Sequence, residues 1–263
     1  MTTVAGGERT DTTTEATGTA EAARPLVALL QAAHDAYPLA LLPGLGAPVD
    51  DAGYFTADDP RLWEALVADT RDRYDAPAHI AAALAWKGYA YWVSLPVTLG
   101  WTLNRRVPLI AASDALVRPL AESPFVSVGL RDVRFAVTAS DPCAGTPDTV
   151  TVPDEAALLA LVRDTLVGGH FAPLIESLRA TTRTGARGLW GTAAEALSAP
   201  LYGHGSDLPG AAAAVEELMA GLGRPLAGLM GMEDGAPRRR TCCLWVALPD
   251  RDACPSCCLT RCK

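Results

Sequence analysis

Apolar residues recur along most of the chain with the spacing of an α-helix. In the segment that begins at Pro60, Leu62, Trp63 and Leu66 fall on one face of such a helix, and Pro60 suits its first turn. Similar apolar faces predict further helices at 25–37, 151–166, 171–178, 188–202 and 209–223. The chain is therefore predicted to be helical in both of its halves.

The segment 107–150 has a different pattern. Short runs rich in β-branched residues, bounded by Pro, Gly and Asp, occupy 106–113, 124–130 and 131–140. They predict a small antiparallel sheet in the middle of a largely helical chain, which is an α+β fold. We divide the chain into a disordered tail at 1–24, an α+β body at 25–237 and a cysteine-bearing C-terminal segment at 238–263.

The segment 80–103 is strongly apolar and raises the question of a membrane span. Lys87 lies inside it and Pro96 interrupts it, and a charged lysine at the centre of a membrane helix costs about 3 kcal/mol. We therefore predict a buried helix that breaks near Pro96, with no stable membrane span. Aromatic residues at this density form a core more often than they line a ligand cleft. They are Trp86, Tyr89, Tyr91, Trp92 and Trp101.

Charge and motifs exclude several functions. The formal net charge is −8, whereas a surface that binds nucleic-acid phosphates is normally basic. The N-terminal residues show no apolar stretch after a basic start, so secretion is not indicated. The sequence also lacks the glycine-rich patterns of nucleotide-binding sites and the motifs of serine hydrolases and zinc proteases.

The cysteines are concentrated at the C-terminus. Six of the seven lie between Cys242 and Cys262, in a chain that is larger than typical disulfide-stapled domains. Cys254 and Cys257 form a compact Cys-Pro-Ser-Cys chelate of the kind found in zinc and iron–sulfur sites. The adjacent Cys242 and Cys243 do not easily reach one tetrahedral ion, but a [2Fe-2S] cluster offers them two iron atoms. The spacing favours a cluster, and a structural four-cysteine zinc site is the alternative.

The C-terminal pattern Cys-Cys-x10-Cys-x2-Cys resembles that of the ferric-siderophore reductases of the FhuF type. The residues that carry this resemblance are Arg240, Cys242, Cys243, Trp245, Pro249, Cys254 and Cys257. It implies a [2Fe-2S] cluster bound by Cys242, Cys243, Cys254 and Cys257. Cys258 and Cys262 are additional to the family pattern, and Cys258 is a second candidate for the fourth ligand.

The resemblance also implies a function. Such a protein reduces Fe(III) in an imported siderophore, by family a hydroxamate, to Fe(II), and takes its electrons from an external donor such as a ferredoxin. It would work in the cytoplasm or at the cytoplasmic face of the membrane. Besides the zinc site, an iron–sulfur sensor of iron or redox state is a further alternative.

Several residues outside the cysteines are candidates for supporting roles. Arg238, Arg239 and Arg240 could raise the potential of an anionic cluster or dock an acidic donor or anionic chelate, or they form a solvated basic segment. Trp190 and His204 are candidates for docking of substrate or donor, although a core tryptophan and a solvated loop histidine are the simpler interpretations. We expect Trp245 to shield one side of the cluster from water.

Overall fold

The computed structural model describes residues 21–36, 42–47, 49, 52–203, 208–233, 236–254 and 256–259. Its helices are α1 (Arg24–Ala36), α2 (Pro60–Tyr74), α3 (Ala78–Asn104), α4 (Glu155–Val162), the π-helix η1 (Arg163–Phe171), α5 (Ala172–Thr182), α6 (Ala186–Gly203), α7 (Ala211–Leu222) and the short 3-10 helix η2 (Trp245–Ala247). Its strands are β1 (Leu42–Pro43), β2 (Gly46–Ala47), β3 (Phe55–Thr56), β4 (Val107–Leu109), β5 (Ala115–Pro119), β6 (Val126–Leu130), β7 (Arg134–Thr138), β8 (Thr149–Val152), β9 (Met230–Glu233) and β10 (Ala236–Arg239). The predicted α+β class is confirmed.

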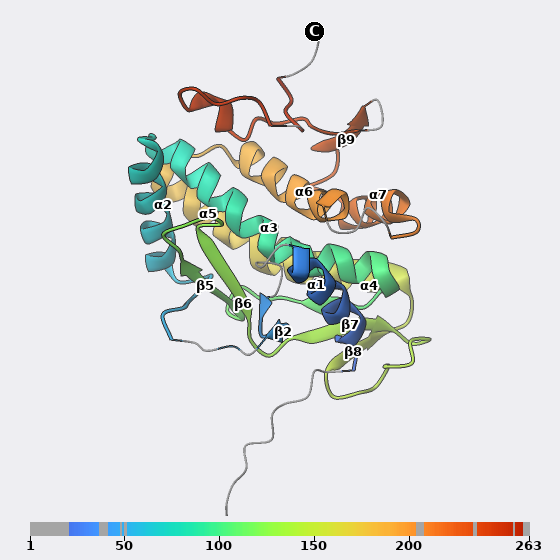
Figure 1. Cartoon of the computed structure of the whole chain (residues 1–263). Helices are drawn as coiled ribbons and strands as arrows, with labels where there is room; N and C mark the ends of the chain where they lie inside the picture. The colour runs from blue at the N-terminus through green and yellow to red at the C-terminus, as the bar shows by residue number, and fades with distance from the viewer. Residues whose placement is uncertain are drawn as a thin grey trace, which may run out of the picture.

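Helix α3 runs through the middle of the molecule, and Figure 1 shows the other helices around it, with the main strands on one side and the C-terminal segment on the other. The helix is buried as predicted, and Trp86, Tyr89 and Trp101 are at most 1% exposed. The predicted break at Pro96 is wrong, because α3 continues to Asn104. An interior proline costs about 3 kcal/mol, and we attribute the continuous helix to the burial of Leu95, Pro96 and Val97 against neighbouring elements.

The strands of the described residues form two small three-stranded sheets and two two-stranded pairs, β1–β2 and β9–β10. One has the order β3-β5-β6 and is antiparallel throughout, as predicted. The other has the order β4-β7-β8, and its β7–β8 pair is parallel. Residue Thr151 was predicted to open a helix but lies in β8. The helix begins four residues later, where the carboxylate of Asp154 accepts a hydrogen bond of 2.8 Å from the N–H of Ala157 and caps α4.

The main hydrophobic core extends from Ala22 to Leu229 along the chain. The predicted tail at 1–24 lies mostly outside the described residues, but Ala22 and Ala23 are buried, so the body begins before residue 25. A second, smaller core joins Ala76 and Ile80 to Leu248 of the C-terminal segment. The C-terminal segment is therefore packed on the body through a core of its own.

One helical stretch among the described residues, Glu155–Thr182, is long and apolar enough to span a membrane, and 44% of its apolar window is buried inside the protein. The core helix of a water-soluble protein meets the same criteria. Its residues Phe171, Leu174 and Ile175 are at most 3% exposed and belong to the main core. This stretch is therefore not a clear membrane span.

Candidate metal centre

Helix α6 provides the platform for the C-terminal segment. Gly188, Gly191, Thr192 and Glu195 follow one another at helical spacing on this helix. A methyl group on Gly191 would lie 1.8 Å from Oγ1 of Thr241, the residue before the first cysteine. Only glycine therefore allows the chain to approach the helix this closely at that point.

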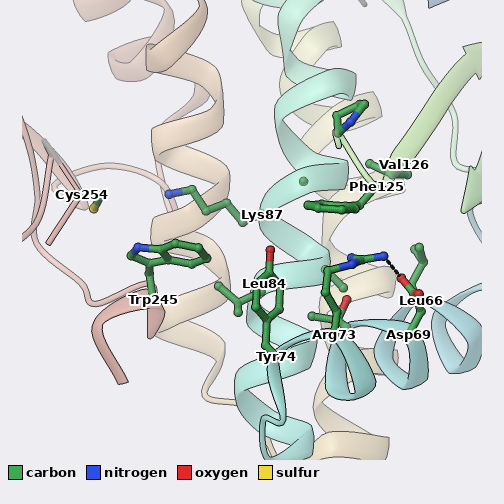
Figure 2. Close-up of a pocket in the computed structure, with 14 residues that line it drawn as sticks. Leu66, Asp69, Arg73, Tyr74, Leu84, Lys87, Phe125, Val126, Trp245 and Cys254 are labelled. Carbon is green, nitrogen blue, oxygen red and sulfur yellow. Dashed lines mark hydrogen bonds and ion pairs between the residues drawn. The ribbon is translucent and has the colours of Figure 1, made fainter. Parts of the chain in front are cut away.

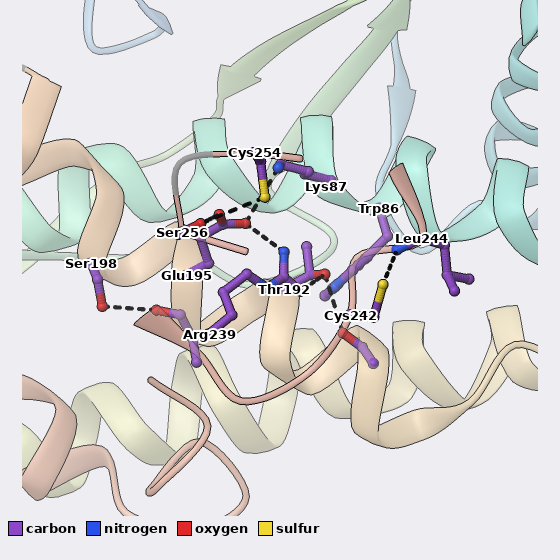
Figure 3. Close-up of polar contacts among 12 residues, drawn as sticks. Trp86, Lys87, Thr192, Glu195, Ser198, Arg239, Cys242, Leu244, Cys254 and Ser256 are labelled. Carbon is purple, nitrogen blue, oxygen red and sulfur yellow. Dashed lines mark hydrogen bonds and ion pairs between the residues drawn. The ribbon is translucent and has the colours of Figure 1, made fainter. Parts of the chain in front are cut away.

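Glu195 joins the two halves of the cysteine motif, as Figure 3 shows. Its Oε2 accepts a hydrogen bond of 2.6 Å from Arg239, and its Oε1 accepts one of 2.5 Å from the hydroxyl of Ser256. The backbone N–H of Arg239 also donates to the carbonyl of Ser256 at 2.9 Å. The strand before Cys242 and the turn that holds Cys254 are thus fixed to each other and to α6.

Backbone N–H groups point at the first two sulfurs. Leu244 has a left-handed conformation, with φ of 66°, which is uncommon for a residue other than glycine. Its N–H donates to Sγ of Cys242 at 3.3 Å, and the N–H of Trp245 donates to Cys243. Successive N–H groups that point at neighbouring sulfurs resemble the anion-binding nests found at iron–sulfur sites.

The second cysteine pair forms the turn that its sequence predicts. The N–H of Cys257 donates to the carbonyl of Cys254 at 2.9 Å, and the N–H of Leu259 donates to Sγ of Cys257 at 3.4 Å. Cys257 is buried, whereas the side chain of Cys258 is partly exposed. Cys257 therefore repeats the pattern of Cys242 and Cys243, in which a sulfur accepts the N–H found two residues later.

Cys243 and Cys254 interact directly. The hydrogen bond from Cys254, together with the N–H of Trp245 and the charges of Lys87 and Arg239, lowers the pKa of Cys243 to about 5, against the effect of its burial. The same hydrogen bond raises the pKa of Cys254. Burial and the charges of Cys242 and Cys257 raise the pKa of Cys258. The surroundings of Cys243 favour a thiolate, the form that binds metals.

The described part of the chain contains no three His, Cys, Asp or Glu side chains that gather around a single metal-ion position, and no disulfide joins its cysteines. Two buried polar atoms beside the motif, Nε of Arg239 and Oγ1 of Thr241, have no hydrogen-bond partner among the described residues. Buried donors are normally satisfied. Oγ1 of Thr241 faces Gly191 of α6, so these two atoms do not identify a ligand. The donor set fits an anionic, thiolate-bound cluster for another reason: backbone N–H groups point at the sulfurs of Cys242, Cys243 and Cys257.

The predicted supporting residues have different positions. Arg239 is 1% exposed, so the prediction that it docks a partner is wrong: its pairing with Glu195 and Thr192 holds it inside. Arg240 is exposed and Arg238 partly so. Trp190 packs half-buried against the main core, as the simpler interpretation expects. His204 and Cys262 lie outside the described residues.

The sequence analysis missed three residues of the site: Lys87, Glu195 and Ser256. Nζ of Lys87 lies 3.5 Å from Oε2 of Glu195, and its charge acts on both Cys243 and Cys254. In the sequence, this lysine is evidence only against a membrane span. A lysine inside an apolar helix, in a chain with one other lysine, is a signal that could have pointed to a site.

A pocket of about 330 Å³ opens beside Cys254. Figure 2 shows Cys254, Trp245 and Lys87 at one end and Phe125, Arg73 and Asp69 at the other. The remaining lining residues come mainly from α2, α3 and the start of β6: Leu66, Thr70, Tyr74, Leu84, Ala85, Gly88, Pro124 and Val126. The volume is at the lower end of the range for small-molecule sites.

Comparison with models of known protein families gives no match to the chain, and comparison with curated proteins gives none either. The resemblance to the siderophore reductases therefore depends on the cysteine spacing and its flanking residues.

Proposed function

We propose that this protein is a ferric-siderophore reductase in which Cys242, Cys243, Cys254 and Cys257 hold a [2Fe-2S] cluster. The observation that carries the proposal is the turn at Leu244, which directs successive N–H groups at Cys242 and Cys243 while Cys254 lies against Cys243. Adjacent sulfurs stabilised in this way suit two neighbouring iron atoms better than one zinc ion.

When bound, such a cluster supplies one-electron transfer at low potential. The electron comes from an external donor of the ferredoxin class, and Fe(III) of the siderophore accepts it and becomes Fe(II). Hard oxygen ligands hold Fe(II) far more weakly, so reduction releases the metal. The chain's own part is to bind the thiolates and to bring the chelate near them.

Two cations compensate for the negative charge of the thiolates. Arg239 and Lys87 share the single carboxylate of Glu195, so this group of three carries a net positive charge beside Cys243 and Cys254. Positive charge favours the reduced, more anionic state of a cluster. Trp245, whose ring packs edge-on against Tyr74 with the centroids 5.8 Å apart, would shield one side of the cluster from water.

The cytoplasmic location is a part of this proposal that comes from the family resemblance, and the resemblance taken alone gives a hydroxamate as the chelate. The location at the inner membrane face follows from where an imported chelate arrives.

The metal content tests the proposal directly. Protein purified without oxygen should contain iron and inorganic sulfide in equal amounts and give an EPR signal after reduction with dithionite. A colourless protein that contains stoichiometric zinc would contradict it. Mixing the reduced protein with a ferric chelate should reoxidise it while Fe(II) appears; if the protein stays reduced, a sensor is the better interpretation.

Cys257 and Cys258 provide a matched pair of variants. We expect Cys257→Ser to lose the cluster, because Cys257 is buried and accepts the N–H of Leu259, and Cys258→Ser to keep it. Iron and sulfide per chain measure the result. The reverse outcome would assign the fourth ligand to Cys258.

A further inference from the structure

The walls of the pocket beside Cys254 are aromatic. Tyr74 comes from the end of α2, Phe125 from the turn before β6, and Trp245 from the turn after Cys243 and Leu244. Three aromatic residues from separate segments therefore line one opening, which Figure 2 shows. Flat rings in a ligand would find ring faces and edges to pack against there.

Positive groups accompany these rings. The guanidinium of Arg73 lies 3.7 Å from the centroid of Phe125, and that of Arg251 lies 5.0 Å from the centroid of Trp245. Arg73 is also paired with Asp69, the one carboxylate among the lining residues. Lys87 is only partly neutralised, because its partner Glu195 lies 3.5 Å away and is shared with Arg239, which lies closer at 2.6 Å.

The backbone conformation of Phe125 supports a functional role for the side of the pocket that this residue lines. Its φ is +67°, which is unusual for a bulky residue and is sustained only where the surroundings hold it. Two hydrogen bonds do so: its N–H donates to the carbonyl of Glu122 at 2.7 Å, and its carbonyl accepts from the N–H of Leu120 at 2.9 Å. The ring is thus held at the pocket rim against its local preference.

We infer that this pocket binds the ferric chelate, and that it selects an anionic chelate with aromatic rings, of the catecholate type. The inference rests on the proposed function, since it takes Cys254 as a cluster ligand that reaches the pocket wall. Catecholate complexes are anionic and their rings are flat, so they match both the cations and the aromatic walls. A linear trihydroxamate complex that carries a positive charge matches neither the cations nor the aromatic walls. The inference therefore replaces the hydroxamate that the family resemblance alone would give.

Binding of gallium(III) chelates to the cluster-loaded protein tests this inference, because gallium(III) mimics iron(III) but cannot be reduced. The probes are gallium complexes of a hexadentate tricatecholate, of citrate and of a linear trihydroxamate, titrated by calorimetry. We expect the tricatecholate to bind most tightly and its affinity to fall as salt is added. The citrate complex is anionic but has no aromatic rings. If it binds as tightly as the tricatecholate complex, the pocket recognises charge alone. Equal or tighter binding of the trihydroxamate would overturn the inference.

Two variants locate the binding. Lys87→Met and Phe125→Leu should each weaken tricatecholate binding by about tenfold, as expected for the loss of one cation or ring contact. Arg179→Met is the matched control, because it removes a positive charge that pairs with Glu176 on the exposed side of α5. Circular dichroism and iron content check that each variant is folded and loaded. Unchanged affinity in both pocket variants would overturn the inference.

The same experiments separate this inference from the proposed function. If the tricatecholate binds in the pocket but its ferric form is not reduced, the reductase proposal fails and the binding site stands. If the ferric chelate is reduced at the same rate by the wild-type protein and both pocket variants, the reductase stands and the binding site is wrong.

Discussion

At the scale of single residues, Arg239 and Glu195 form an ion pair that is almost entirely buried. The side chain of Arg239 has no exposed surface, and that of Glu195 is 13% exposed. Burying an ion pair gains little net stability, but leaving one partner alone is strongly unfavourable, because the remaining charge has lost its water without compensation. Each of the two residues therefore needs the other.

Glu195→Ala should lower the free energy of unfolding by about 3–5 kcal/mol, since Arg239 would keep a buried charge with no carboxylate partner. Urea titration followed by circular dichroism measures the change. The control is Glu176→Ala, which removes an exposed carboxylate paired with Arg179 and should change stability by less than about 1 kcal/mol. Similar values for both variants would show that the burial of Arg239 is not costly.

His170 is a second buried group with a defined role. Its Nδ1 lies 2.9 Å from the carbonyl of Ile110 and must donate to it, so its Nε2 accepts from the hydroxyl of Tyr89 at 2.5 Å. Burial lowers the pKa of His170 to about 4, although the carbonyl and the charge of Asp58 act in the opposite direction. The histidine is therefore neutral in the folded protein.

This pKa predicts how stability depends on pH. The unfolded chain has a histidine pKa near 6.5 and so binds a proton that the folded protein refuses between pH 6.5 and about 4. The contribution of His170 to the free energy of unfolding is fully present above pH 6.5. It falls by about 3 kcal/mol as the pH drops toward 4. Comparing urea unfolding of the wild-type protein and His170→Gln across this range measures the effect. An equally steep fall in the variant would exclude His170 as its source.

At the level of elements, the contact between α6 and the chain before Cys242 depends on small residues. Gly191 faces Thr241 with no room for a side chain, while a methyl group on Gly188 would lie 3.7 Å from the carbonyl of Cys242, an ordinary contact. Both glycines lie in the same helix, so alanine has the same intrinsic advantage of about 1 kcal/mol at each position. They differ only in the space available.

Gly191→Ala should therefore destabilise the protein by about 1–3 kcal/mol through overpacking and reduce the iron content, because Thr241 must move and Cys242 with it. Gly188→Ala is the matched control and should be neutral or slightly stabilising. Thermal unfolding and iron per chain measure both. If Gly191→Ala kept full stability and full iron content, the close contact with Thr241 would not determine the position of the cysteines.

In the molecule as a whole, the body and the C-terminal segment have different sources of stability. The body contains the main core, whereas the C-terminal segment has Leu248, with Leu244 and Trp245 packed beside it, in a small core of its own. A small apolar core gives limited stability, and metal binding adds to the stability of the segment that supplies the ligands.

Loss of the proposed cluster should therefore loosen the segment and leave the body intact. In a variant with Cys242, Cys243, Cys254 and Cys257 changed to serine, we expect amide exchange to become faster in 241–259 and to stay slow in α3 and α6. Hydrogen exchange read by mass spectrometry compares this variant with the cluster-loaded protein. Faster exchange throughout α3 and α6 would show instead that the cluster supports the whole fold.

The sequence by itself determined most of the helices, the α+β class and the cysteine spacing, because periodicity and turn chemistry are local. The helix that begins at Pro60 and the turn between Cys254 and Cys257 belong to this group. The same local reasoning was wrong at Pro96, where packing on α3 outweighs the lost hydrogen bond, and at Thr151, which pairs in parallel with Val137 of the preceding strand β7.

Only the tertiary structure decided which side chains surround the cysteines. Glu195 lies 108 residues after Lys87 and 44 residues before Arg239, and none of their local sequences indicates that they meet. The burial of Arg239 and the pocket beside Cys254 are likewise products of α3 and α6 lying side by side under the C-terminal segment. Charge pairing and cavity shape depend on distances in space, and periodicity along a chain does not contain them.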